Sequence, residues 1–179
     1  MSTTAASTPP QADLQALRSF LDGPDAEVRN LVREWLSRPG NAPVVDLDRD
    51  RYRAQVLAWA KELADEGGTA IGFPVEYGGE GEVGKSIAAF ETLAFGDLSL
   101  LVKCGVQFGL FGGAVLHLGT AKHHERYLSA ITSLELPGCF AMTETGHGSN
   151  VQALRTTMTY DTSTDEFVIN TPDPTARSR

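Results

Sequence analysis

A change in hydrophobic periodicity near Pro137 constrains the fold of this chain more than any other feature. Before Pro137, apolar residues recur three and four positions apart, which predicts amphipathic helices. After it, short runs rich in β-branched residues predict strands. We therefore expect a mainly α fold, with a helical bundle domain over residues 12–136 and the start of a β-domain over residues 137–179. The Ser-, Thr-, Ala- and Pro-rich residues 1–11 are expected to form a disordered tail.

The expected helices have recognisable start and stop residues. One helix begins at Pro24 and ends at Arg38-Pro39-Gly40, and the next starts after Asp48 and ends at Gly67-Gly68. Their apolar stripes are Val28, Leu31, Val32, Trp35 and Leu36 in the first, and Tyr52, Val56, Trp59, Ala60 and Leu63 in the second. Further helices are expected at Asp13–Leu21, at Val83–Phe95 and from Thr120, as N-cap, to Thr132, with a loop over Thr69–Gly84.

The apolar section Leu98–Leu118 contains glycines at positions 105, 109, 112 and 113. It predicts a buried helix pair or one broken helix, in which the glycines allow close packing. A membrane-spanning helix needs about 20 consecutive apolar residues. This section is too glycine-rich and too interrupted for that, so no membrane span is expected.

Strands are expected after Pro137. The apolar run Cys139–Met142 predicts a strand that leads into a loop, and Thr156–Ile169 predicts a β-hairpin with its turn at Asp161–Asp165. A lone hairpin is marginally stable in water. A chain that changes to strands only near its end therefore looks cut short.

Charge and cysteine usage exclude some classes of function. The formal net charge of −8 disfavours nucleic-acid binding, which needs clustered Lys and Arg, but it leaves room for a small nucleotide-binding patch. The N-terminus lacks the basic-then-apolar pattern of a signal peptide. Cys104 and Cys139 form no CxxC motif, which favours a reduced, intracellular protein. No metal site is expected, because the adjacent His123 and His124 would point about 100° apart on a helix.

The segment Cys139–Asn150 has the composition of a ligand-binding loop. Gly146 and Gly148 would let a ligand approach the backbone closely, and the hydroxyls of Thr143 and Ser149 are short hydrogen-bond donors. Such a loop suits an anionic or carbonyl-rich ligand. A purely structural turn fits the same residues.

Several segments, in order along the chain, resemble acyl-CoA oxidases and dehydrogenases. Met142-Thr-Glu-Thr-Gly-His-Gly-Ser149 is similar to the motif at the start of that family's middle β-domain. Gly146-His147-Gly148 has the oxidase form, where dehydrogenases carry Gly-Ala-Gly. The other similar segments are Gly72–Gly79, His117–Leu128, Leu154–Asp161 and Asp165–Pro172. The resemblance covers about residues 30–175.

The resemblance implies a cofactor and a site. The middle domain would be an antiparallel β-barrel, of which residues 137–179 are the truncated start, and the cofactor would be FAD. Thr143 would hydrogen-bond the pyrimidine end of the flavin, and Met142 would present its backbone to the same ring. Gly148 and Ser149 would lie near the flavin diphosphate, and Ser149 would also lie near the CoA-bearing substrate.

The implied reaction is oxidation of an acyl-CoA to a trans-2-enoyl-CoA, with the electrons returned to O₂ as H₂O₂. The family's general base is a glutamate in a C-terminal helical domain and would lie beyond Arg179, so no catalytic residue is expected within the chain. Glu144 would shape the loop instead of acting as a base. His147 would either shape the turn or contact the substrate.

Two other functions stay open at this point. The chain could be part of an acyl-CoA dehydrogenase that passes electrons to a carrier protein, or a non-catalytic helical interaction module. The expected partners are the acyl-CoA substrate and a second copy of the full-length protein, since the resembled enzymes are homo-oligomers, or a complementing C-terminal chain. The expected location is the cytoplasm in a bacterium and the peroxisome in a eukaryote.

Overall fold

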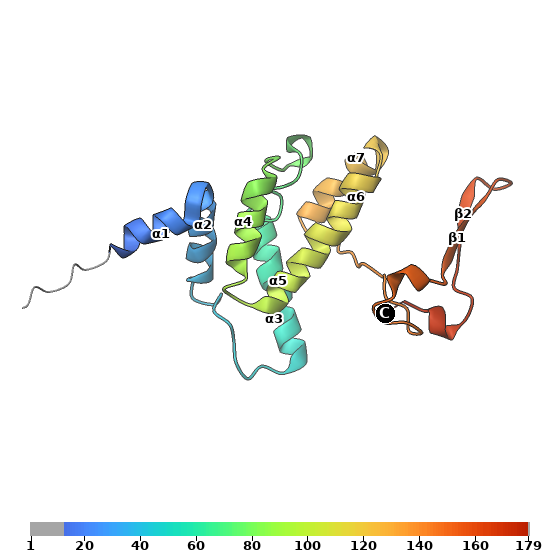
Figure 1. Ribbon diagram of the computed structural model, residues 1–179, viewed down its shortest axis with the longest axis horizontal. Helices are drawn as coiled ribbons and strands as arrows, with labels where there is room; N and C mark the ends of the chain where they lie inside the picture. The colour runs from blue at the N-terminus through green and yellow to red at the C-terminus, as the bar shows by residue number, and fades with distance from the viewer. Residues whose placement is uncertain (1–12, 179) are drawn as a thin grey trace, which may run out of the picture. The chain divides into compact units, whose positions relative to one another are not determined.

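The structure is a computed structural model that describes residues 13–178 (Figure 1). It divides into two compact units, Met1–Pro137 and Gly138–Arg179. The predicted tail at residues 1–11 lies outside the described residues. The first unit contains α1 (Leu14–Asp22), η1 (Gly23–Asp25), α2 (Ala26–Leu36), α3 (Arg49–Asp65), η2 (Val75–Tyr77), α4 (Val83–Leu93), α5 (Leu98–Cys104), η3 (Gly105–Gly112), α6 (Gly113–Leu118) and α7 (Ala121–Thr132). The second contains η4 (Val151–Ala153), β1 (Thr157–Asp161), β2 (Glu166–Asn170) and η5 (Pro174–Ala176).

Several helices begin at an N-cap residue whose side chain accepts hydrogen bonds from backbone N–H groups. Asp13, Asp48 and Asp97 each accept two such bonds, at 2.9–3.0 Å, at the starts of α1, α3 and α5. A cap of this kind stabilises a helix by about 1 kcal/mol. Thr120 caps α7 as predicted, and the Thr120 N–H in turn donates to Nδ1 of His123 at 3.0 Å. The starts predicted after Asp48 and Thr120 are thus confirmed.

The core of the helical unit gathers around Trp59, which is 1% exposed. Trp35, Leu100 and Leu128 belong to the same buried cluster, so α2, α3, α5 and α7 all contribute to it. The indole N–H of Trp59 donates to the Gly40 carbonyl at 2.9 Å, which satisfies the polar atom of this ring. In Figure 1, α2 lies beside α4, and α3 lies beside α5, as their contacts require.

Leu98–Leu118 forms one continuous helix, so the expectation of a helix pair or a broken helix was wrong. The segment passes from α-helix to the π-helical η3 and back, and glycines at both ends of η3 keep helical dihedrals. Because the helix is continuous, the expected interruption of Leu98–Leu118 does not argue against a membrane span. Within residues 13–178 this is the one helix long and apolar enough to cross a membrane, with a mean hydropathy of 1.5. A core helix meets the same criterion, and this helix supplies Leu100, Cys104 and Phe108 to the buried cluster.

In the second unit, β1 and β2 form the predicted antiparallel hairpin. Met158 pairs with Ile169 and Tyr160 pairs with Phe167, so these four side chains share one face of the two-stranded sheet. The rings of Tyr160 and Phe167 lie 5.2 Å apart between centroids. All four side chains are exposed.

The strand predicted at Cys139–Met142 was wrong. These residues are irregular, and the nearest β-pairing is an isolated bridge between Glu144 and Ser178. The apolar run does suit a strand, but a strand forms only where a neighbour supplies ladder hydrogen bonds. Among residues 13–178 no segment pairs with this run.

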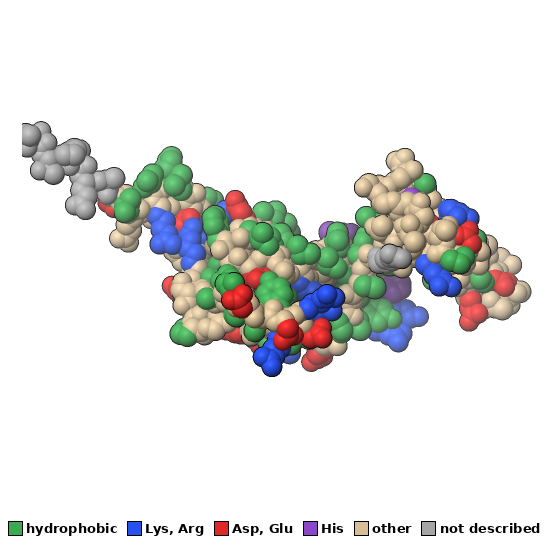
Figure 2. Space-filling model, turned by 90° about the horizontal axis from the view of Figure 1, so that it is seen from below, with side chains coloured by type: hydrophobic (Ala, Val, Ile, Leu, Met, Phe, Trp, Pro, Cys, Tyr) green, Lys and Arg blue, Asp and Glu red, His purple; other side chains and the backbone are tan. Residues whose placement is uncertain are grey.

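Large apolar side chains also reach the surface of the helical unit. The side chains of Phe20, Phe95 and Leu118 are each more than four-fifths exposed, at 81%, 83% and 85%. Figure 2 shows apolar side chains on this unit lying between groups of charged ones. The helical stripes therefore bury one part of the apolar surface and leave another part in contact with solvent.

Candidate functional site

The helical unit contains an apolar cavity of about 660 Å³ next to α2, α4 and the π-helical segment. Its apolar lining includes Val28, Val32 and Trp35 of α2, Ile87, Phe90 and Leu93 of α4, and Cys104, Phe108 and Leu110 of the long helix. Small-molecule sites in proteins have volumes of about 300–1,000 Å³ and are mostly apolar. A hydrocarbon chain is therefore a ligand that matches this cavity in both size and chemistry.

Two charged residues that line the cavity are paired with each other. Arg38 donates to Oε2 of Glu66 at 3.0 Å, and it also donates to Oε1 of Glu62 at 3.1 Å. The hydrogen bond from Arg38 holds the pKa of the Glu66 carboxyl below its ordinary value. Because these charges satisfy one another, an apolar ligand could enter without separating them.

Cys104 lines the same cavity as a neutral group. Burial raises the pKa of its thiol to about 12, so the side chain stays protonated near neutral pH. A protonated thiol is a poor nucleophile and packs like a small apolar side chain. Cys104 is 6% exposed and belongs to the buried core cluster.

Two glycines of the π-helical segment shape one wall of the cavity. A Cβ atom added to Gly105 would lie 3.2 Å from Cζ of Phe90, whereas one added to Gly109 would meet no atom within 4 Å. Neither residue has a positive φ angle. The absence of a side chain at Gly109 therefore keeps this part of the cavity open and is not required by the backbone.

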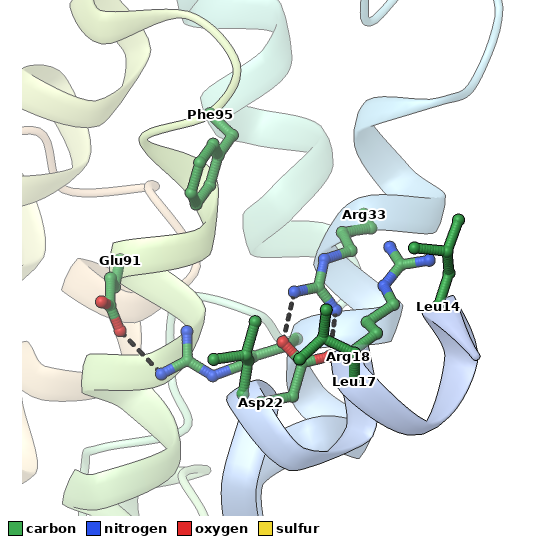
Figure 3. Close-up of a pocket in the computed structure, with 9 residues that line it drawn as sticks. Leu14, Leu17, Arg18, Asp22, Arg33, Glu91 and Phe95 are labelled. Carbon is green, nitrogen blue, oxygen red and sulfur yellow. Dashed lines mark hydrogen bonds and ion pairs between the residues drawn. The ribbon is translucent and has the colours of Figure 1, made fainter. Parts of the chain in front are cut away.

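A second hollow, of about 380 Å³, lies between α1, α2 and α4 (Figure 3). Arg33 is bound to both carboxylate oxygens of Asp22, at 2.5 and 2.7 Å, and Arg29 is bound to Glu91 at 2.7 Å. The hydrogen bond from Arg33 lowers the pKa of Asp22. These ion pairs join α1 to α2, and α2 to α4. The charged residues that line this hollow therefore stabilise the packing of the three helices.

The glycine-containing loop of the second unit presents the residues predicted to bind a flavin. Met142, Thr143, Gly148 and Ser149 are all exposed. The hydroxyls of Thr143 and Ser149 make no hydrogen bond within residues 13–178. A Cβ atom added to Gly148 would meet no atom within 4 Å, and Gly148 has no positive φ angle. The loop thus offers two free hydroxyls beside a backbone that a ligand can approach closely.

Glu144 is the buried anchor of this loop, with 1% of its surface exposed. Its carboxylate accepts the Thr156 N–H at 2.8 Å and the Arg155 N–H at 3.0 and 3.1 Å. Burial acts to raise the pKa of this carboxyl, but the hydrogen bonds from the Thr156 and Arg155 backbone outweigh it and lower the pKa. The prediction that Glu144 shapes the loop is confirmed.

The histidines have local structural contacts. His147, in the loop, places Nε2 at 3.5 Å from Oε2 of Glu144. His124 packs its ring edge-on against Tyr77, with centroids 5.8 Å apart, and His123 takes part in the cap of α7. Within residues 13–178 no three His, Cys, Asp or Glu side chains gather where they could hold a metal ion.

Comparison with known proteins identifies the family. Residues 25–135 match the family described as acyl-CoA dehydrogenase, N-terminal domain. The chain belongs to the acyl-CoA dehydrogenase family. It is 38% identical over 160 residues to the peroxisomal acyl-coenzyme A oxidase 2 of Arabidopsis thaliana, an alignment that covers 89% of this chain and 22% of the relative. The predicted resemblance to the N-terminal part of an acyl-CoA oxidase is confirmed.

Solved structures of the same family share the fold of this chain. The acyl-CoA oxidase 3 of Yarrowia lipolytica matches it with a TM-score of 0.72 at 28% identity, over 92% of this chain and 23% of that one. An acyl-CoA dehydrogenase of Bacillus anthracis, complexed with FAD, matches with a TM-score of 0.67 at 19% identity, over 83% of this chain and 25% of that one. The chain therefore spans about a quarter of the length of these two solved relatives.

Sequence reasoning missed the apolar cavity. The apolar stripe that contains Trp35 predicts a buried side chain, and in the structure Trp35 also lines the cavity wall, as does Phe90. A stripe predicts that a side chain points inward, but whether neighbouring side chains fill the space depends on how the helices pack. The available signal was the pair Gly105 and Gly109 on an otherwise apolar helix, where larger side chains would have closed the space.

Proposed function

We propose that this chain is the acyl-binding and flavin-contacting part of an FAD-dependent acyl-CoA oxidase, which converts an acyl-CoA to a trans-2-enoyl-CoA and O₂ to H₂O₂. The observation that carries the proposal is the apolar cavity of about 660 Å³, found in a unit that belongs to the acyl-CoA dehydrogenase family. An acyl chain is the part of this substrate that requires an apolar enclosure. Membership of the family supplies the reaction class.

In this proposal the acyl chain lies in the cavity, between α2, α4 and the long helix. Each methylene removed from water contributes about 0.8 kcal/mol. Trp35, Phe90 and Phe108 would contact the chain, because all three line the cavity. The Arg38–Glu66 pair would remain bonded at the cavity wall and would not need to contact the acyl chain.

The second unit is proposed to be the beginning of the flavin-binding β-domain, and residues 12–136 to be the helical domain. Bound FAD would supply an acceptor for the hydride removed from the β-carbon of the substrate. The free hydroxyl of Thr143 would donate to the pyrimidine end of the flavin, and the Met142 backbone would face the same ring. Gly148 and Ser149 would lie near the diphosphate, with Ser149 also near the substrate. The exposed hydroxyls and the open space at Gly148 fit this assignment.

Two features support an oxidase over a dehydrogenase. The relative at 38% identity is named an oxidase, and Gly146-His147-Gly148 has the oxidase form of the loop. That relative is also named peroxisomal, which supports the same location for this protein if its source is a eukaryote. Peroxide formation from an acyl-CoA in air, compared with reduction of an artificial electron acceptor without O₂, would separate the two reactions in the enzyme that contains these residues.

Acyl binding can be tested on the chain itself through its tryptophans. Trp35 lines the cavity and Trp59 does not, so a Trp59→Phe variant leaves one tryptophan as a reporter of cavity occupancy. Titration with dodecanoyl-CoA should change the emission of Trp35, and CoA without an acyl group should leave it unchanged. Equal responses to the two compounds, or no response to dodecanoyl-CoA up to millimolar concentration, would remove the acyl chain from this cavity.

A further inference from the structure

The loop Thr143–Ser149 is held from one side by the segment Asp173–Ser178. The Thr145 N–H donates to the Arg177 carbonyl at 2.9 Å, and the Gly146 N–H donates to the Thr175 carbonyl at 2.6 Å. The hydroxyl of Thr145 also donates to the Arg177 carbonyl, at 3.1 Å. The backbone positions of the loop therefore depend on a segment about thirty residues further along the chain.

The contact at Gly146 leaves little room for a side chain. A Cβ atom added to Gly146 would lie 3.0 Å from the Thr175 carbonyl oxygen and 3.1 Å from its Cβ. By contrast, Gly148 faces open space. Glycine is therefore needed at the two positions for different reasons. Gly146 packs on the supporting segment, whereas Gly148 faces the side where a ligand could approach.

Arg155 connects both supports of the loop. Its backbone N–H donates to both oxygens of the buried Glu144, which anchors the loop from within. Its guanidinium donates to Oγ1 of Thr175 at 2.9 Å and is ion-paired with Asp173. Asp173 in turn accepts the Thr175 N–H at 2.8 Å and the Thr175 hydroxyl at 2.6 Å, which fixes the turn that carries the Thr175 carbonyl.

The chemistry of this cluster matches a supporting role. The hydrogen bonds from Thr175 and the Arg155 guanidinium lower the pKa of Asp173, so its carboxylate stays ionised and able to accept near neutral pH. Arginine suits the position because its planar guanidinium can bond the carboxylate and the hydroxyl together. A lysine would keep the charge but could not span both partners in the same way.

We propose that Arg155 is a positioning residue of the flavin-binding loop, which acts through Asp173 and Thr175 and does not touch the ligand. Through these two residues it fixes the backbone at Thr145 and Gly146, and therefore the placement of the Thr143 and Ser149 hydroxyls. This inference rests on the proposed function for what the loop binds. The supporting contacts themselves lie within the chain and can be measured without any ligand.

Hydrogen exchange of the Thr145 and Gly146 amides, followed by NMR on the whole chain, tests the positioning role. Arg155→Met should speed the exchange of both amides by about 3- to 10-fold, because the lost ion pair is half-exposed, with Arg155 at 53%. Arg155→Lys should lie between Arg155→Met and the unchanged protein. Arg126→Met is the matched control, since the guanidinium of Arg126 lies over the Tyr127 ring in the other unit. Amides of β1 and β2 should exchange at unchanged rates.

An FAD titration on the same substitutions, made in the enzyme that contains these residues, links the position of the loop to its function. Arg155→Met should weaken FAD binding by about the same 3- to 10-fold and alter the visible circular dichroism of the bound flavin, with partial rescue in Arg155→Lys. Unchanged exchange at Thr145 and Gly146, or faster exchange throughout the hairpin, would overturn the positioning role. Faster loop exchange with unaltered FAD affinity would overturn it as well. If the enzyme that contains these residues binds no FAD with Arg155 unchanged, the proposed function fails, and the exchange rates still decide whether Arg155 positions the loop.

Discussion

Filling the open wall at Gly109 should shorten the acyl chain that the cavity can accept. Gly109 lines the cavity, and a Cβ atom placed there meets no atom within 4 Å, so the first atom of the Gly109→Leu side chain has open space around it. A leucine side chain has four carbons and would displace roughly three or four methylenes of the ligand. At about 0.8 kcal/mol for each buried methylene, the loss is about 2.4–3.2 kcal/mol, or roughly 60- to 200-fold in affinity for a long chain.

The same helix provides a matched control at Gly113. A Cβ atom added to Gly113 also meets no atom within 4 Å, but Gly113 does not line the cavity. Replacing glycine in a helix by leucine should raise the stability of both variants by about 0.5–1 kcal/mol, because leucine has the higher helix propensity. Both variants therefore gain helix stability, but only Gly109→Leu places a side chain at the cavity.

The assay is the emission of Trp35 in the Trp59→Phe background, titrated with butanoyl-CoA and dodecanoyl-CoA. Gly109→Leu should weaken the binding of dodecanoyl-CoA strongly and that of butanoyl-CoA little, while Gly113→Leu should leave the affinity for both compounds unchanged. Equal losses in the two variants would show that the effect comes from the helix and not from the cavity. Unchanged dodecanoyl-CoA binding in a folded Gly109→Leu protein would refute the placement of the acyl chain.

Three further predictions address the loop and the helical core. In the complete enzyme that contains these residues, Thr143→Ala should weaken FAD binding by about 5- to 150-fold, since one hydrogen bond to a buried ligand group contributes about 1–3 kcal/mol, and unaltered quenching of flavin fluorescence there would remove Thr143 from the site. Because the folded-state pKa of Glu144 lies below its ordinary value, its stabilising effect is present above the ordinary pKa and is lost as the pH falls through the folded value. The Thr156 amide should therefore exchange faster, at matched intrinsic rates, in acid than at neutral pH, and a pH-independent protection factor would contradict this. Asp97→Ala should lower the free energy of unfolding by about 2–4 kcal/mol, the sum of a lost helix cap and an unpartnered Tyr52 hydroxyl, as measured by urea denaturation. A loss no larger than that of Tyr52→Phe would show that the cap contributes nothing.

The helices could be predicted from the sequence because their signals are local. Asp48 and Thr120 accept hydrogen bonds from residues two or three positions away, so a short window contains the whole interaction. The hairpin was equally accessible, since a turn composition lies between its two strands. The strand predicted at Cys139–Met142 failed for the opposite reason, because a strand depends on a neighbour that the local sequence does not specify.

The site residues show the same division. The free hydroxyls of Thr143 and Ser149 could be expected from the loop composition, and the resemblance added what they would bind. The supports of the loop could not be expected, because Arg155 and Thr175 lie twenty positions apart and meet only through the fold. The cavity could not be predicted either, because the same apolar stripe occurs whether a helix faces packed side chains or an open space.

The two proposed binding regions differ in where their polar groups are satisfied. In the cavity wall, Arg38 and Glu66 bond each other, so ligand entry breaks no ion pair and the binding energy comes from burial of apolar surface. In the loop, Glu144 and Arg155 are satisfied internally and fix the backbone, whereas the Thr143 and Ser149 hydroxyls are left free. A rigid backbone with free donors lowers the ordering cost of binding a polar ligand. In the proposed function the helical unit would bind the hydrocarbon of an acyl-CoA, and the loop would bind the hydrogen-bonding groups of a flavin.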